Sequence, residues 1–170
     1  MTVSNVKKVI YFNALTFGPY NIETINDKTK LVLGQVLFNT KVFDFIHTDY
    51  YNDKMVTPLK KCFIVYTLID YPHRLPVLKR LFVNLEKKYI YLNKRMFNID
   101  IGYIALEKIV VASTKNFSHR IYLKGGIYGD LQFIRKDGKY RPLQWTFQDY
   151  KQDFVLSFFE RARNYLKKLI

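Results

Sequence analysis

The sequence predicts an α+β fold, in which a mainly antiparallel sheet ends in a β-meander and packs against two or three helices. Two segments, near residues 75–92 and 155–169, carry apolar residues at helical spacing. Short apolar runs bounded by Gly, Pro and Asn indicate strands elsewhere. Glycine-containing turns at residues 124–126 and 137–138 join neighbouring runs as in hairpins. With 170 residues and 49% hydrophobic content, a single domain over residues 1–170 can bury its own core.

The first part of the chain is expected to contain a strand, a helix and a second strand. Residues 9–16 form an apolar run that a Phe-Gly-Pro sequence ends. A helix over residues 21–33 follows, with Asn21 as its cap and Gly34 just after its last turn. Residues 35–45 return as a strand.

A polar segment comes next. In an extended chain His47, Asp49 and Tyr51 face one side. A His and an Asp at this spacing could share a metal ion or a phosphate-bound water. The alternative is an ordinary strand end with a solvated Asp, because a metal site needs more than two ligands.

The middle of the chain predicts a buried strand over residues 62–69 and then an amphipathic helix. Asp70 is the expected cap of this helix, and Pro72 lies in its first turn. Apolar residues recur along it at i+3 and i+4: Leu75, Leu78, Phe82, Leu85, Tyr89 and Leu92. Most basic residues lie off that stripe and predict a solvated face: Arg74, Lys79, Arg80, Lys87 and Lys88.

Beyond this helix the sequence predicts the β-meander. Residues 98–103 are expected to form a turn that holds Asp100. Residues 109–112 form a buried strand, and strands over residues 119–123 and 127–134 follow as a hairpin.

A type I′ turn at Asp137-Gly138 leads to a strand over residues 140–145. Thr146 at the N-cap and Asp149 three residues later form an Asp version of a capping box. Apolar residues at helical spacing then predict the last helix: Val155, Phe158, Phe159, Ala162, Tyr165, Leu166 and Leu169.

The composition limits which partners and which cell compartment are expected. A net charge of +14 can attract phosphate polymers or anionic membranes, although adenine- and thymine-rich codons could also supply the lysines. Cys62 is the single cysteine and is expected to be a buried, inert thiol. No apolar run could span a bilayer and the N-terminus resembles a strand more than a signal peptide, so a soluble cytoplasmic protein without a membrane partner is expected.

Polar residues gather between positions 98 and 130, among strong strand formers. Lys115 and Arg120 lie near strand ends and suit a phosphate group. Gly125 and Gly126 would let backbone N–H groups approach the same ligand. The alternative for the glycine pair is an ordinary hairpin loop.

A histidine and several carboxylates complete the predicted site. His119 could act as general acid or base, and Asp49 and Asp100 could activate water. Together with Asp130, these two carboxylates could also bind Mg²⁺ or Mn²⁺. The alternatives are that His119 hydrogen-bonds within the sheet and that Asp149 only caps a helix.

Five segments have the sequences TDYY, NIDIGY, TKNFSHRIYL, GIY and WTFQDY, at residues 48–51, 98–103, 114–123, 126–128 and 145–150. In this order they resemble a prokaryotic family known as domain of unknown function 4416. Its members typically carry N-[IL]-D-P-G-Y, T-T-K-D, H-R-[IV]-Y-L, G-[IV]-Y-A-E and W-T-[YF]-P-D-Y. The resemblance covers nearly the whole chain.

The chain departs from these motifs at a few positions. Ile101 and Gln148 replace prolines, and Ser113 replaces a threonine. Asn116 replaces an Asp, which argues against a required charge there, whereas Asp130 replaces a Glu and keeps the carboxylate. The resemblance implies binding or catalytic roles for the residues that match: Asp49, Tyr50, Asp100, Lys115, His119, Arg120, Tyr122, Tyr128, Trp145 and Asp149.

Two classes of function fit this set. The first is an enzyme that acts on a phosphate-bearing small molecule or nucleotide, such as a metal-assisted hydrolase or transferase. Four aromatic residues could stack on its base, with Asp149 also contacting the substrate: Tyr50, Tyr122, Tyr128 and Trp145. Some family members are labelled GTP-binding, but no P-loop, HExxH, CxxC or GxSxG motif occurs. The second class is a non-catalytic RNA-binding module with a basic, aromatic surface, and a non-enzymatic scaffold is a third alternative.

Overall fold

A computed structural model describes residues 5–19, 22–46 and 53–170. Within them, nine strands form one open sheet, in the order β11-β10-β8-β7-β1-β4-β2, with β3 beside β4 and β9 beside β10. Every pairing between neighbouring strands of this sheet is antiparallel. The predicted α+β class is therefore confirmed. None of the helices in the described ranges is long and apolar enough to cross a membrane.

The strands of the sheet are β1 (Val9–Phe17), β2 (Val36–Asn39), β3 (Phe43–Asp44), β4 (Lys60–Asp70), β7 (Phe97–Ile104), β8 (Lys108–Ser113), β9 (Arg120–Lys124), β10 (Ile127–Lys136) and β11 (Lys139–Pro142). A separate small hairpin consists of β5 (Ile90–Tyr91) and β6 (Lys94–Arg95). The helices are α1 (Ile22–Leu33), α2 (Leu75–Lys87) and α3 (Asp153–Lys167), with short 3₁₀ turns η2 (Pro72–Arg74) and η3 (Gln148–Lys151).

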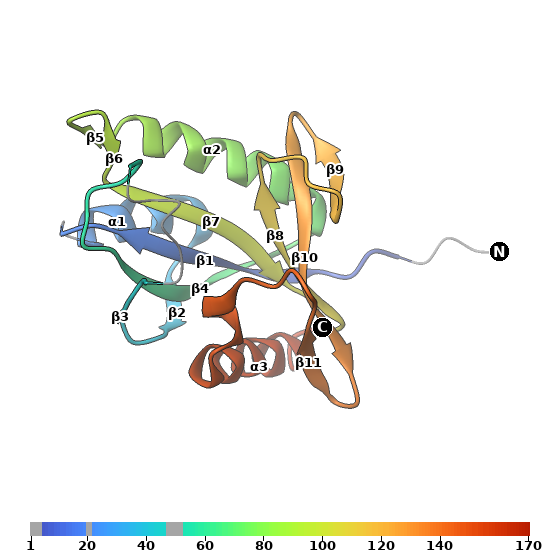
Figure 1. Ribbon diagram of the computed structural model, residues 1–170. Coiled ribbons are helices and arrows are strands. Elements are labelled where there is room, and N and C mark those ends of the chain that lie inside the picture. The colour runs from blue at the N-terminus through green and yellow to red at the C-terminus, as the bar shows by residue number, and fades with distance from the viewer. Residues whose placement is uncertain (1–4, 20–21, 47–52) are drawn as a thin grey trace.

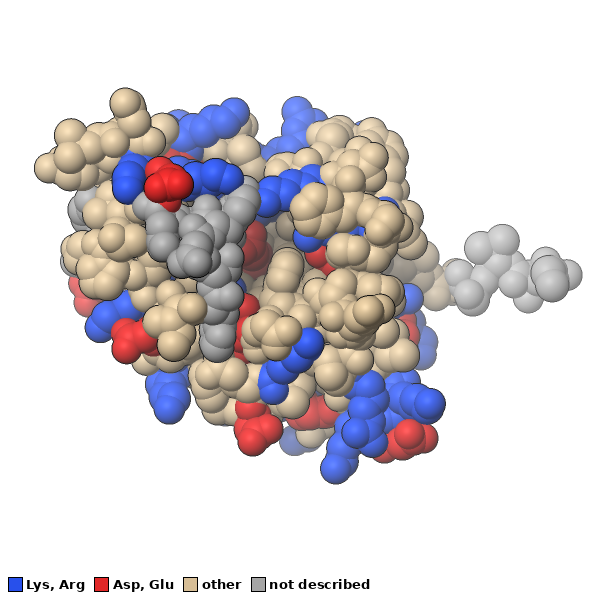
Figure 2. Space-filling view, in the orientation of Figure 1, with Lys and Arg blue, Asp and Glu red and all other residues tan. Residues whose placement is uncertain are grey.

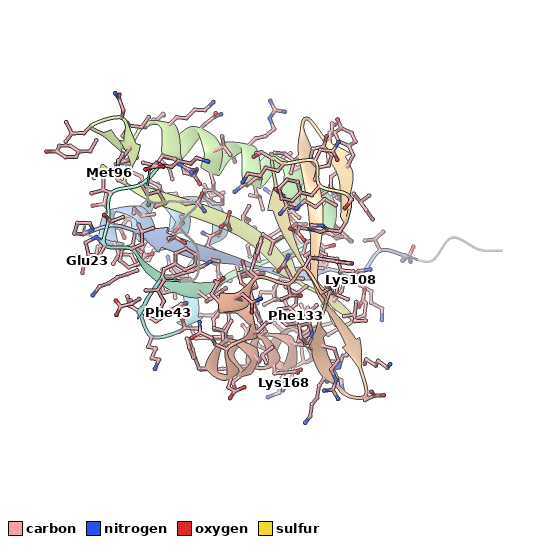
Figure 3. All side chains as sticks on the ribbon, in the orientation of Figure 1. Glu23, Phe43, Met96, Lys108, Phe133 and Lys168 are labelled. Carbon is pink, nitrogen blue, oxygen red and sulfur yellow. The ribbon has the colours of Figure 1, made fainter. Side chains whose placement is uncertain are left out.

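Helices cover both faces of the sheet, with α1 and α2 on one face and α3 on the other (Figure 1). Strand β1 is buried along its whole length because alternate side chains enter the two cores. Tyr11 points into the core under α1 and α2, and Phe12 points into the core over α3. Figure 3 shows Phe43 and Phe133 at two places along α3, where they pack against Phe154 and Phe159.

The sheet forks between β7 and β8. These strands pair only from Gly102 to Ile104, and no strand of the described residues pairs with the first half of β7 on that side. Figure 1 shows the two strands together at one end and apart at the other. The backbone of Ile99 is satisfied by α2 instead, because its N–H donates to Glu86 Oε1 at 2.7 Å and its carbonyl accepts from Lys79 Nζ at 2.8 Å. Two charged side chains of a helix thus replace a strand at this edge.

Gly102 stands at the point where the fork closes. A Cβ atom on it would lie 2.6 Å from the Phe12 ring and 2.7 Å from the Val110 carbonyl oxygen. Only glycine lets β7 approach both groups, so this residue fixes where the two strands join.

Several predicted elements are confirmed. The first strand, the three helices and both hairpin turns all occur, although the ends of two helices differ from the prediction. Gly34 follows α1 with a φ of 80°, and its N–H donates to the Lys30 carbonyl. Asp137 and Gly138 have φ values of 51° and 74°, as a type I′ turn requires. Asn21, the predicted cap of α1, lies outside the described residues.

The prediction of a turn at residues 98–103 is wrong, because this segment is the middle of strand β7. Asn98 and Asp100 suggested a turn, but both are strand residues whose polar groups find partners in the fork. The strand expected at residues 35–45 is two short strands, β2 and β3. Between them Thr40 Oγ1 accepts the N–H of Phe63, which interrupts the ladder with β4.

The predicted starts of two helices are also wrong. The Asp70 carboxylate accepts the neighbouring N–H of Tyr71 and does not cap α2, which begins after η2. Thr146 does not form a capping box, because its hydroxyl donates to the Gln132 carbonyl, and α3 begins only at Asp153. The strand before it ends at Pro142, short of Trp145.

The end of α2 and its basic residues need a further correction. The helix ends at Lys87, and Leu92 lies in the β5–β6 turn beyond it. Lys79 was assigned to the solvated face but is buried at the fork. Cys62 is buried in β4 as expected, and burial raises the pKa of its thiol to about 12.

Candidate functional site

A cavity of about 560 Å³ opens at the fork of the sheet. Figure 2 shows a hollow near the middle of this face, with acidic atoms inside it. Its lining comes from β4, α2, β6, β7, β8, β9, β10 and the segments after β3, β8 and β11. The charged lining residues are five cations, Lys61, Lys79, Arg95, Lys115 and Arg120, and four carboxylates, Glu86, Asp100, Asp130 and Asp149.

The wall formed by α2 and β7 carries two linked ion pairs. Lys79 Nζ lies 3.3 Å from Asp100 Oδ1, and Arg95 Nη1 lies 3.0 Å from Glu86 Oε2. Asn98 joins the pairs, because its side chain accepts from Arg95 at 3.0 Å and donates to Asp100 Oδ2 at 2.8 Å. The five side chains form one continuous polar network that also holds the open edge of β7.

Burial and charge act in opposite directions on the two carboxylates of this wall. Burial raises the pKa of Asp100, but Lys79, Lys61 and the Asn98 hydrogen bond outweigh burial and hold that pKa below its ordinary value. For Glu86 burial prevails, so its pKa lies above the ordinary value despite nearby Lys79 and Arg95. Two carboxylates in one cavity therefore differ in proton affinity, a common feature of functional sites.

The wall formed by β4 holds a third buried pair. Lys61 Nζ lies 2.6 Å from Asp149 Oδ2, and both side chains are buried. Three rings surround the ammonium group, with centroids 4.8 Å away for Phe45, 5.5 Å for Phe63 and 5.3 Å for Tyr150. The rings attract the cation through their π faces and exclude water from the pair.

The wall formed by β8, β9 and β10 centres on Asp130, whose side chain is fully buried. Arg120 Nε donates to its Oδ2 at 2.7 Å, and Gln132 donates to its Oδ1 at 2.7 Å. Arg120 also donates to Ser113 Oγ at 2.7 Å. His119 Nε2 lies 3.7 Å from Asp130 Oδ1, so a buried carboxylate stands behind the imidazole.

Aromatic side chains stand at the mouth of the cavity. Trp145 is 38% exposed and stacks on the His119 ring, with centroids 4.9 Å apart. Phe117 is also exposed, and the Arg120 guanidinium lies 4.4 Å from its ring centroid. The mouth thus offers planar, partly exposed faces next to cationic groups.

The structure brings together most of the predicted site. Six of the predicted residues line the cavity: Asp100, Lys115, Arg120, Asp130, Trp145 and Asp149. His119 lies beside it, behind Trp145 and next to Asp130. Asp49 and Tyr50 are outside the described residues, as are His47 and Tyr51.

Four other predicted residues lie elsewhere, on the β9–β10 hairpin: Tyr122, Gly125, Gly126 and Tyr128. Gly125 and Gly126 form its tight turn, with φ values of 59° and 77°. The Tyr122 hydroxyl accepts the N–H of Gly125, and its ring packs edge-on against Tyr128. The glycine pair therefore forms the hairpin turn, and its predicted contact with a phosphate stays a prediction.

Sequence reasoning missed four of the nine charged residues that line the cavity, namely Lys61, Lys79, Glu86 and Arg95, together with Asn98. A signal for two of them exists. Lys79 and Glu86 each follow a core residue, Leu75 and Phe82, by four positions, so both lie on the buried stripe of α2. Charged residues on a buried stripe indicate a polar cavity beneath the helix.

The predicted metal site is only partly visible. Within the described ranges, no three His, Cys, Asp or Glu side chains are grouped closely enough to hold a metal ion. Asp100 and Asp130 are each paired with a cation, Lys79 and Arg120. Asp49, the third predicted ligand, is not described.

Comparison with known proteins agrees with the resemblance of the motifs. A family model described as a domain of unknown function, DUF4416, matches residues 7–165. No curated protein and no solved structure matches the chain. Because the match covers nearly the whole sequence, the chain belongs to the DUF4416 family.

Proposed function

We propose that the cavity binds a phosphate-bearing small molecule, such as a nucleotide or sugar phosphate, and that the protein is an enzyme acting on it. The observation that carries this proposal is the concentration of five cations and four carboxylates around one cavity of about 560 Å³. Small-molecule sites commonly have volumes of about 300–1,000 Å³. The excess of one positive charge favours an anionic ligand.

Fold stability alone does not account for so many buried charges. Removing a charged pair from water costs about as much as its attraction returns, so apolar residues of similar size are often at least as stabilising. Here the pairs Lys61–Asp149 and Lys79–Asp100 surround an open volume that side chains do not fill. Charges held around an open volume are better explained by a polar ligand.

The phosphate group fits best at the mouth, beside Lys115 and Arg120. Lys115 is exposed there, and its carbonyl accepts from Arg120 Nη1 at 3.3 Å. Within the described part of the chain, Nη2 of Arg120 has no hydrogen-bond partner. A guanidinium fixed by Asp130 with donors left over suits phosphate oxygens. A planar base could stack on the exposed ring of Phe117 or Trp145.

His119 is the residue that we propose for proton transfer. Its ring is held between Trp145 and the Asp130 carboxylate, beside the proposed phosphate position. A carboxylate behind an imidazole holds the ring in one orientation and one tautomer, which suits a general acid or base. Mg²⁺ or Mn²⁺ would add charge stabilisation at the phosphate, and Asp100 and Asp130 are the described carboxylates that could contribute. We assign no step to a metal.

The test is a thermal-shift and calorimetric titration with nucleotides and sugar phosphates, with and without Mg²⁺. A bound ligand at about 100 times its Kd should stabilise the fold by about 2.7 kcal/mol, a shift of roughly 5–10 °C. Lys115→Ala should abolish the shift, whereas Lys136→Ala, an exposed lysine of β10, should keep it. Equal shifts in both variants would refute the phosphate assignment.

The same titration tests the RNA-binding alternative. A short single-stranded RNA that stabilises the protein when the small ligands do not, with an effect lost at high salt, would replace the proposal by that alternative. If a small ligand binds, His119→Ala should keep its binding but lose turnover, once a reaction is found by screening phosphate release.

A further inference from the structure

The outward face of α2 and the β5–β6 hairpin form a continuous surface, which we call the α2 ridge. Figure 1 shows α2 along one side of the molecule, with the hairpin projecting beyond its end. We infer that the α2 ridge docks on an anionic lipid surface. Three features of the ridge point to such a partner: its apolar tip, the charge of its helix face and its shape. None of them depends on the proposed cavity ligand.

The tip of the β5–β6 hairpin is apolar, and its residues do not suit the turn that they form. Ile90, Tyr91 and Leu92 are consecutive and exposed, Leu92 by 79%. Leu92 and Asn93 have φ values of 47° and 60°, which the two central residues of a type I′ turn need. Gly, Asn or Asp is favoured at both positions, and leucine is strained there. A strained, exposed leucine gains nothing within the described protein, so it points to an external apolar partner.

The outward face of α2 combines apolar and cationic residues. Val77 and Leu81 are exposed on the same stripe as Arg80, Lys87 and Lys88. The carboxylate of Glu86, the single acidic residue between positions 75 and 95, is buried on the cavity side. Every exposed charge of the helix is therefore positive. Figure 2 shows Lys and Arg atoms above and beside the uncharged projection at this corner, with acidic atoms next to them.

The surface near the other end of α2 is also cationic. Gly125 of the β9–β10 turn lies against Arg80, since a Cβ atom on it would be 3.2 Å from that guanidinium. Lys124 adds a further exposed cation, and residues 120–128 contain no acid. The ridge is thus about 20 Å of helix between two hairpins.

A lipid surface fits these observations better than a protein or RNA. A stable protein interface needs about 800 Å² on each partner, and three tip side chains with a largely cationic helix face do not offer an apolar patch of that kind. RNA would use the cations and Tyr91, but it gives no reason for the exposed Leu92 and Ile90. Shallow insertion of aliphatic side chains flanked by lysines is the usual mode of peripheral binding to anionic bilayers.

The test is sedimentation of the full chain with vesicles of phosphatidylcholine alone and of phosphatidylcholine mixed equally with phosphatidylglycerol. We expect binding to the anionic vesicles only, weakened by salt. Leu92→Asn suits the turn, so it should fold and weaken binding about tenfold. Replacing Lys87 and Lys88 together by alanine should weaken it about thirtyfold. The control is Leu31→Asn, which removes a leucine of α1 that is 83% exposed and should leave binding unchanged.

Four outcomes would overturn the inference: no binding to anionic vesicles, binding unaffected by Leu92→Asn, equal losses in Leu92→Asn and Leu31→Asn, or binding to single-stranded RNA in place of vesicles. Circular dichroism and thermal melting of each variant separate a loss of docking from a loss of fold. Leu92→Asn should also keep any ligand binding in the cavity, so failure of this proposal and failure of the cavity proposal can be told apart.

Discussion

Replacing Lys79 by methionine tests whether the fork of the sheet depends on a buried charge. The substitution keeps the length and the apolar contacts of the side chain but removes its ammonium group. That group donates to the Ile99 carbonyl at 2.8 Å, lies 3.3 Å from Asp100, and belongs to a side chain that is 6% exposed. Methionine therefore leaves a carboxylate and a buried carbonyl without their partner.

The expected cost follows from these contacts. Breaking a buried ion pair commonly costs about 3–5 kcal/mol, because one charge stays buried. Asp100 is 22% exposed and still accepts from Asn98, which places the cost near the lower end, at about 3 kcal/mol. Replacing Asp100 by asparagine in the same chain removes that stranded charge. The double variant should thus be more stable than the sum of the single costs predicts, by about 1–3 kcal/mol.

Urea denaturation followed by circular dichroism and by the fluorescence of Trp145, the single tryptophan, measures each free energy of unfolding. The control is Lys30→Met, which breaks the exposed pair Lys30–Asp27 and should cost at most about 1 kcal/mol. The reasoning fails if Lys79→Met costs no more than this control. It also fails if the costs of the Lys79 and Asp100 variants simply add, because the two residues would then not be coupled.

Three further predictions follow from single contacts. Gly102→Ala should lower the free energy of unfolding by about 1–3 kcal/mol, because the new methyl meets a ring and a carbonyl below 3 Å. Gly129→Ala meets only apolar side chains, Leu123 at 3.4 Å and Val110 at 3.5 Å, and should cost less in the same urea assay. Cys62, with a pKa of about 12, should not react with an aromatic disulfide reagent at pH 8 until the protein is unfolded. The pKa of Asp100 is lower in the folded state than in the unfolded state, so its ionised carboxylate stabilises the fold above the ordinary carboxyl pKa. This contribution is lost as the pH falls through the folded pKa. Asp100→Asn should therefore make the free energy of unfolding fall less steeply below about pH 4.

Short-range signals were sufficient for the elements that the sequence predicted correctly. The stripes of α2 and α3 place Phe82 and Phe159 in the core because helical period and burial agree within a few turns. The turn at Asp137-Gly138 needs only two residues that tolerate positive φ. The residues within such an element are sufficient to predict it, because its location does not depend on what packs against it.

Long-range partners decide the elements that were predicted wrongly. Asp100 suggested a turn because a carboxylate in an apolar run has no partner within reach in the sequence. In the fold Lys79 and Asn98 supply partners, and the segment is a strand paired with β1. Thr146 likewise matched a capping box, but its hydroxyl donates to the carbonyl of Gln132 in β10. Polar residues are ambiguous in a sequence because their role is set by the group that they meet.

The site was predicted in part for the same reason. Arg120 and Asp130 belong to one polar stretch of the sequence, so their density was visible, whereas Trp145 was predicted from the family motif that it matches. Lys61 and Asp149 are far apart in the sequence and meet only because β4 passes under the segment before α3. No local pattern in a single sequence reports such a pairing.

The pair of Lys61 and Asp149 also shows how a structural role can be separated from a functional one. Both side chains are buried among Phe45, Phe63 and Tyr150, an environment that an apolar pair could fill. Replacing them together by Met and Leu should leave the free energy of unfolding unchanged or raise it by about 1–4 kcal/mol, whereas Lys61→Met alone should lower it by about 3 kcal/mol. If the pair is retained to serve a ligand, the double variant is stable but no longer shows the thermal shift with phosphate compounds. A double variant that unfolds more easily than the single one would instead make the pair a structural requirement, and the buried charges would no longer support a ligand in the cavity.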